Sequence, residues 1–148
     1  MSVIKNIAVG LVLGAVSLWS YDIRVAEPYP TAEQPRQIVI GVSRGDDTSI
    51  QQALGTADDV LKYYVDGKAR IRVVAYHEGI RLLLKKEKAI ESRVQALQQQ
   101  GVVFVACGNT MDAAKIDDWS LTENVVVVSV GVADIIERSK EGAVYLQP

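Results

Sequence analysis

The stretch GVVFVACGNT, residues 101–110, joins an uninterrupted apolar run to a polar turn. A continuous run of this kind is typical of a central strand that is buried on both faces of a parallel sheet. The run ends at Cys107, and the turn behind it contains Asn109 and Thr110, which are residue types that cap helices. The stretch therefore predicts a buried parallel strand that leads through a short turn into a helix.

Segments of strand and helix character alternate on both sides of this stretch. Short runs rich in β-branched residues predict strands at residues 37–43, 70–77, 125–128 and 142–146. Apolar residues recur at helical spacing over residues 48–65, 80–84, 90–97 and 131–140. The alternation predicts one α/β domain with a mostly parallel sheet and helices on both faces.

Local signals refine two of these helices. Asp47 and Thr48 are both good N-caps for the first helix, and Gly67 can close it in a left-handed conformation. In the last helix the apolar residues are expected to face the sheet, and they are Val132, Ile135 and Ile136.

Composition excludes several classes of protein. The 148 residues are 49% hydrophobic and 23% charged, which is ordinary globular composition. A formal charge of -2 predicts no broad basic surface, so we expect no nucleic-acid partner. One cysteine and one histidine cannot form an intramolecular disulfide or a Cys/His zinc cage. We expect neither a metal nor a cofactor, because the glycines also fit neither GxxxxGK[ST] nor GxGxxG.

The first 20 residues have the pattern of an export signal. Lys5 precedes an apolar run over residues 7–19, which is shorter than the roughly 20 residues that span a bilayer but long enough for a secretory core. Ala15 and Ser17 supply small residues for cleavage after Ser17. We expect a cleaved signal peptide and a periplasmic or extracytoplasmic protein, with an uncleaved membrane anchor or a buried first helix as alternatives.

The next residues divide this signal from the folded part. Residues 21–35 contain three of the four prolines, which favours an extended linker. We expect the folded domain to cover residues 36–148.

The candidate site lies at the carboxyl ends of the predicted strands, where loops and helix N-termini converge in a parallel sheet. Cys107 ends one strand, and His77 ends another. If these strands are neighbours, the two side chains emerge about 5 Å apart. Backbone amides after Cys107 and a nearby imidazole would lower the pKa of the thiol, so Cys107 and His77 are the candidate catalytic pair.

Each of these residues also has a simpler interpretation. A free cysteine often packs as a small hydrophobic residue, and a lone histidine at a strand end is often only a hydrogen-bonded surface residue. No Asn or Asp is visibly placed to orient the imidazole, so a full cysteine hydrolase is not predicted.

Three segments carry a family resemblance. VVAYHEGIRLLL, QQQGVVFVACGNTM and VGVADIIERSKEGAVYLQP resemble the DsrE/DsrF-like family of small sulfur-relay proteins, over the stretch from Arg36 to Pro148. The resemblance implies a three-layer α/β/α sandwich around a mostly parallel five-stranded sheet. It also implies a homo-oligomer, commonly a trimer or hexamer, with sulfur donor and acceptor partners.

The same resemblance implies a role for the cysteine. Family members of the sulfur-relay type carry sulfur as a persulfide on the cysteine that matches Cys107. The expected function is therefore sulfur transfer on Cys107 with help from His77, and the ligand-binding residues are expected to be Gly79, Gly108, Asn109, Thr110 and Gly131. The alternative is a non-catalytic oligomeric protein that binds a small ligand or partner at the same strand ends.

Overall fold

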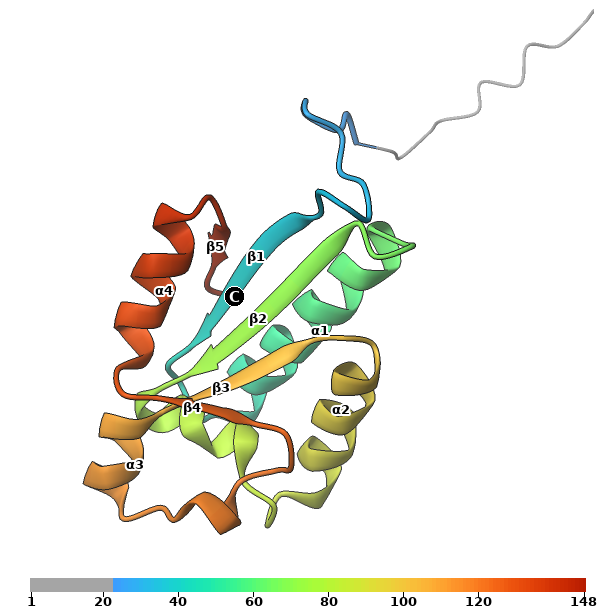
Figure 1. Cartoon of the computed structure of the whole chain (residues 1–148). Helices are drawn as coiled ribbons and strands as arrows, with labels where there is room; N and C mark the ends of the chain where they lie inside the picture. The colour runs from blue at the N-terminus through green and yellow to red at the C-terminus, as the bar shows by residue number, and fades with distance from the viewer. Residues whose placement is uncertain (1–22) are drawn as a thin grey trace, which may run out of the picture.

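The computed structural model describes residues 23–148 and shows a five-stranded sheet with helices on both faces (Figure 1). The strands are β1 (Arg36–Val42), β2 (Ala69–Ala75), β3 (Val103–Cys107), β4 (Val126–Val128) and β5 (Val144–Leu146). The α-helices are α1 (Asp47–Tyr63), α2 (Lys88–Gln99), α3 (Gly108–Ala114) and α4 (Gly131–Lys140). Two 3-10 helices, η1 (His77–Leu83) and η2 (Asp118–Ser120), lie in the connections.

The strands lie in the order β4-β3-β2-β1-β5, and every pair is parallel. The carboxyl ends of the strands therefore share one edge of the sheet, as the α/β prediction requires. β2 and β3 are neighbours, with Ala75 beside Ala106, and Cys107 of β3 lies beside Val128 of β4. The predicted fold class is confirmed.

One face of the sheet is covered by α1 and α2 and holds the larger core (Figure 1). Alternate residues of the strands point into it, and Phe104, Ile40 and Val73 are almost completely buried there. The helices contribute apolar residues at helical spacing, including Ile50, Leu54 and Val94. Deep burial of both helix and strand side chains makes this face the main source of hydrophobic stabilisation.

The opposite face is covered by α4 over its carboxyl half. Its core is small and consists of Val39, Val74, Val105 and Ile135. Of the three α4 residues expected to face the sheet, only Ile135 is buried, whereas Val132 and Ile136 are exposed. The prediction for those two residues is wrong, because a single helix crossing a flat face buries only one narrow row of side chains.

The helical segment expected at residues 80–84 is a 3-10 helix that starts at His77. Gly79 explains the change, because its N–H bonds to the Tyr76 carbonyl at 3.0 Å and to the Ser43 carbonyl at 3.1 Å. These bonds draw the chain toward β1 directly after β2, and β2 ends at Ala75 rather than at residue 77. His77 has a φ of 49°, so the chain turns at that residue.

The first helix begins close to its predicted start, but with a different cap. Asp46 is extended and its carboxylate accepts from the Ser49 N–H at 3.0 Å, which lowers the pKa of Asp46. Asp47 accepts instead from Arg81 of η1 at 2.6 Å. The helix ends near Tyr63, a few residues before the predicted Gly67.

Residues 23–35 precede the sheet and form no helix or strand. The predicted signal peptide or anchor falls on residues 1–20, which lie outside the described residues. Within residues 23–148, none of the helices combines the length and the apolar character that crossing a bilayer demands.

Two glycines give a test of this packing. A Cβ at Gly79 would lie 2.0 Å from the Val42 carbonyl oxygen, whereas a Cβ at Gly55 of α1 would meet nothing within 4 Å. We expect Gly79→Ala to reduce the free energy of unfolding by about 1–3 kcal/mol, since backbone must shift. Gly55→Ala should raise it by about 0.5–1 kcal/mol, because alanine favours the helix. Urea denaturation measures both, and a neutral Gly79→Ala would contradict the close approach.

Candidate functional site

Cys107 lies where the end of β3 meets the starts of two helices. It is the last residue of β3 and the N-cap of α3, and it is 5% exposed. Gly131, the first residue of α4, lies against it, because a Cβ on Gly131 would be 3.0 Å from the Cys107 Cβ. The thiol is therefore enclosed by backbone on two sides.

These surroundings favour the thiolate. Burial of the sulfur by itself raises the pKa of Cys107, but hydrogen bonds from the Gly131 N–H and from the Thr110 hydroxyl lower it. The N–H groups of Thr110 and Asn109 act in the same direction, and the pKa of the thiol falls below its usual value. Neutral donors, and not a cation, are thus the source of the shift.

Thr110 links the thiol to the start of η1. Its hydroxyl oxygen accepts from the backbone N–H of His77 at 3.0 Å. A hydroxyl that accepts in this way keeps its own proton for another partner, and here that partner is the Cys107 sulfur. Thr110 therefore holds a donor toward the sulfur and ties α3 to the segment after β2.

The side chain of His77 is exposed, and its ring packs edge-on against Tyr76 with 5.1 Å between the ring centroids. His77 and Cys107 line the same cavity, as their positions in the sequence predict. Among residues 23–148, the contact that connects His77 to the thiol is the backbone N–H bond to Thr110. In this part of the chain, no hydrogen bond or ion pair joins the imidazole to the sulfur.

The cavity over Cys107 has a volume of about 590 Å³ and is largely apolar. Its walls come from the end of β2, from η1, α3 and the start of α4, and its lining residues are Tyr76, His77, Glu78, Ile80, Cys107, Asn109, Thr110, Ala113, Ala114, Val130 and Val132. The apolar wall residues Ile80, Val130 and Val132 were not predicted as site residues. Their only signal in the sequence is that they flank the glycines at residues 79 and 131.

A second polar group adjoins this cavity through Tyr76. Tyr145 of β5 covers Gly41, where a Cβ would lie 2.6 Å from the phenol oxygen. Burial and a hydrogen bond with Tyr76 raise the pKa of Tyr145 to about 12, so the phenol stays protonated near neutral pH. The Gln147 side-chain oxygen, 3.2 Å away, is an alternative acceptor for the single phenol proton, and the Gln147 amide donates to Ser43 at 3.2 Å.

The predicted glycines have different places. Gly131 contacts Cys107 and would also bring a Cβ within 3.2 Å of Val74. Gly108 begins α3 and lies against the Val128 carbonyl, with a Cβ distance of 3.0 Å. Gly79 lies on the Val42 carbonyl and is not part of the cavity lining. The cavity thus contains Cys107, His77, Asn109 and Thr110, while the three glycines act through close backbone packing.

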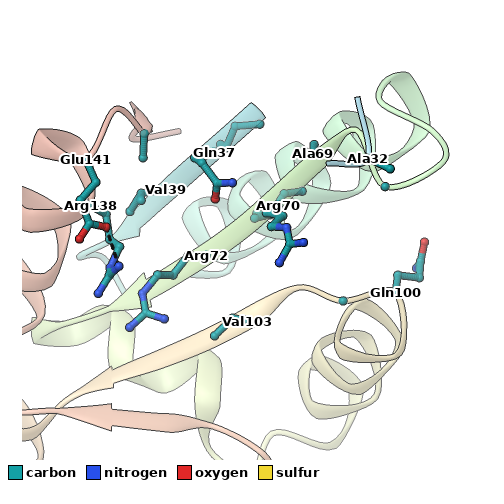
Figure 2. Close-up of a pocket in the computed structure, with 15 residues that line it drawn as sticks. Ala32, Gln37, Val39, Ala69, Arg70, Arg72, Gln100, Val103, Arg138 and Glu141 are labelled. Carbon is teal, nitrogen blue, oxygen red and sulfur yellow. Dashed lines mark hydrogen bonds and ion pairs between the residues drawn. The ribbon is translucent and has the colours of Figure 1, made fainter. Parts of the chain in front are cut away.

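Another hollow, of about 710 Å³, lies on the α4 face of the sheet near the amino ends of the strands (Figure 2). Three guanidinium groups border it, from Arg70 and Arg72 of β2 and Arg138 of α4. Arg72 is held by Asp134 through bonds of 2.6 Å and 2.8 Å, and Arg138 pairs with Glu141 at 2.6 Å. None of the residues that line this hollow lines the cavity over Cys107.

In the part of the chain from residue 23 onward, no three His, Cys, Asp or Glu side chains are grouped so that they could hold a metal ion.

Comparison with solved structures supports this fold. The MTH1491 protein of Methanobacterium thermoautotrophicum, described as a protein of unknown function, is 32% identical, with a TM-score of 0.72 over 76% of this chain and 99% of its own. The ychN protein of E. coli is 13% identical, with a TM-score of 0.62 over 77% and 99% of the two chains. The BT1422 protein of Bacteroides thetaiotaomicron is 14% identical, with a TM-score of 0.57 over 76% and 94%.

No curated protein matches the chain. The model of the DsrE/DsrF-like family matches residues 38–148, which contain the sheet except for the first two residues of β1, together with the cavity over Cys107. The chain therefore belongs to the DsrE/DsrF-like family.

Proposed function

We propose that this protein carries sulfane sulfur as a persulfide on Cys107 and passes it to an acceptor. Membership of the DsrE/DsrF-like family indicates a function of the sulfur-relay type. The proposal of a persulfide on Cys107 rests on the hydrogen-bond donors around the sulfur, which lower the pKa of the thiol. This thiol lines an open cavity. A thiolate in such a place is a nucleophile that can accept and release sulfur.

The loading step needs no redox partner. The Cys107 thiolate attacks the outer sulfur of a donor R–S–SH, a new S–S bond forms, and the S–S bond of the donor breaks with its electron pair leaving on RS⁻. The leaving thiolate takes a proton from water. The donors around Cys107 then stabilise the negative charge of the ionised persulfide as they did that of the thiolate.

His77 has two ways to contribute. Its backbone N–H fixes the Thr110 hydroxyl, and its imidazole lines the cavity. The backbone contribution does not depend on the side chain. We propose that the imidazole assists as a hydrogen-bond donor to the leaving group, because the ring lies at the same cavity as the sulfur.

The alternative function is passive binding, with Cys107 only a packed side chain. The low exposure of Cys107, 5%, is the observation that favours this alternative. A packed thiol resists alkylation in the folded protein, whereas a carrier thiol reacts rapidly near neutral pH.

We also propose that copies of the chain associate through the uncovered part of the α4 face. Parallel sheets are normally covered on both faces, yet here the amino half carries the exposed side chains Val103, Val126 and Arg70. Among residues 23–148, Arg70 forms no ion pair, and neither does Glu137 on the outer side of α4. A second copy can satisfy both charges while it covers the valines, so a copy of this chain is the fitting partner.

Sulfur loading gives the first test. Purified protein treated with a low-molecular-weight persulfide should gain the mass of one sulfur atom on the peptide that contains Cys107, as measured by mass spectrometry. The nearly isosteric Cys107→Ser should keep the fold and gain none. Equal loading of Cys107→Ser would contradict the proposal.

The Thr110 hydroxyl gives the second test. Thr110→Val removes one donor to the sulfur, so the pKa of Cys107 should rise and alkylation at pH 7 should slow by about fivefold, the effect of one lost hydrogen bond. Because the thiolate is the reactive form, the rate of Thr110→Val should recover as the pH is raised. Thr110→Ser keeps the hydroxyl and should react like the parent.

His77→Ala removes the imidazole but keeps the backbone N–H that donates to the Thr110 hydroxyl, so it is the matched control for the ring. An unchanged pH profile of alkylation in His77→Ala assigns the activation to backbone and hydroxyl donors. A rise in the pKa of Cys107 would assign part of it to the ring.

Self-association is tested by light scattering. We expect the purified protein to have a mass larger than that of a dimer. Arg70→Glu combined with Val103→Asp should lower that mass, because both changes place carboxylates on the uncovered face. Lys86→Glu, on an exposed turn before α2, should leave it unchanged. A monomeric parent protein at micromolar concentration would contradict the proposal.

A further inference from the structure

The charges around the cavity over Cys107 are distributed in an uneven way. Its lining contains one carboxylate, Glu78, one imidazole, His77, and no lysine or arginine. The nearest lysine in the sequence, Lys115, follows Ala114 at the end of α3 and is not a lining residue. A donor that enters the cavity therefore meets Glu78 and the Cys107 thiolate, and no lysine or arginine of the lining balances their charges.

The apolar walls of the cavity also disfavour a charged donor. Ile80, Val130 and Val132 supply apolar surface to the cavity that contains the sulfur, and Ala113 and Ala114 add to it. Transfer of a charged group from water to such a surface is costly unless a partner neutralises it. An uncharged group of the same size has no such cost and gains from the removal of apolar surface from water.

The backbone donors near the sulfur do not provide a separate anion site. The N–H groups of Gly131, Thr110 and Asn109 and the Thr110 hydroxyl already bond to Cys107. The Asn109 N–H also donates to the Ser129 carbonyl at 3.1 Å. A carboxylate, sulfonate or thiosulfate group on the donor would have to compete with the sulfur for them.

The guanidinium groups that could bind an anion lie elsewhere. Arg70, Arg72 and Arg138 border the hollow near the amino ends of the strands, which shares no lining residue with the cavity over Cys107 (Figure 2). The positive groups and the thiol thus lie near opposite ends of the strands, with the guanidinium groups toward the amino ends and Cys107 at the carboxyl end of β3.

From these observations we propose that the cavity over Cys107 selects small sulfane-sulfur donors whose non-reacting part is uncharged, and discriminates against anionic donors. The inference rests on the proposed sulfur transfer at Cys107 and names its substrate class. The reaction is the balanced exchange given above, with RS⁻ as the leaving group, and the selection acts on the R group that lies along Ile80, Val130 and Val132.

A matched pair of donors tests this inference. The persulfides of N-acetylcysteine and of N-acetylcysteine amide carry the same reacting group and differ by one carboxylate. Loading rates of the protein are measured by mass spectrometry for both donors. Each loading rate is divided by the rate at which the same donor loads a peptide of residues 104–110. This peptide contains the same cysteine without the cavity. This division removes the intrinsic difference between the two leaving thiols.

We expect the ratio of the amide rate to the carboxylate rate to be about tenfold higher for the protein than for the peptide, because like charges repel and the donor carboxylate loses hydration in the cavity. Glu78→Gln should reduce that preference by about twofold to threefold. Glu123→Gln, an exposed carboxylate outside the cavity, is the control and should not change it. Val132→Lys, which adds a cation to the wall, should bring the preference close to that of the peptide.

The outcomes separate this inference from the proposed function. Loading of Cys107 with no charge preference, or with a preference for the carboxylate, overturns the inference and leaves sulfur transfer intact. Loading only from a protein-bound persulfide, with neither small donor effective, also overturns the inference. Failure of every donor to load Cys107 overturns the proposed function itself.

Discussion

The contact between Gly131 and the ends of β2 and β3 determines how the rest of the α4 face is built. A Cβ at this position would lie 3.0 Å from the Cys107 Cβ and 3.2 Å from Val74, so any side chain here would push α4 and the strand ends apart by a few tenths of an ångström. The close approach directs the first N–H of α4 at the Cys107 sulfur. Packing and chemistry are therefore one constraint, because any side chain that moved α4 outward would also remove a donor from the thiol.

From that starting point, α4 runs across the sheet, and a partly buried ion pair fixes it to β2. Arg72 and Asp134 are 22% and 9% exposed and form two parallel hydrogen bonds of 2.6 Å and 2.8 Å, the geometry in which arginine binds a carboxylate most strongly. Breaking such a pair leaves a charge without its partner, which is unfavourable. The pair therefore restrains α4 to one position on the sheet. The helix therefore covers the carboxyl half of the sheet and leaves the amino half uncovered.

The sequence predicted the layer structure well because that structure follows from periodicity. The apolar run before Cys107 and the amphipathic stretches of α1 and α2 carry strong patterns, and they formed the expected elements. The pattern failed where close backbone packing decides the conformation. Gly79 draws η1 onto β1, and α4 buries Ile135 but not Val132 or Ile136, because these outcomes depend on contacts between distant segments.

Some residues of the candidate site were also predictable from the sequence, and others were not. Cys107 and its donors Asn109 and Thr110 were identifiable, since a parallel sheet places the residues after a strand at its functional edge. The hydrogen bond from the His77 backbone to Thr110 was not, because a histidine is identified in a sequence by its imidazole and not by its peptide group. The apolar walls come from two separate segments, Ile80 from η1 and Val130 and Val132 from the start of α4, and only the fold brings them to the same cavity as the sulfur.

The thiol is activated without a fixed opposite charge, and this has a consequence for its chemistry. A thiolate that is paired with a lysine or arginine is bound to that cation, and its nucleophilic attack must weaken the ion pair. Around Cys107 the lowering of the pKa comes from N–H and O–H donors. In the proposed transfer, the same preorganised donors would face both the thiolate and the ionised persulfide. A site of this kind changes little between uptake and release of sulfur, which is the property that reversible transfer requires.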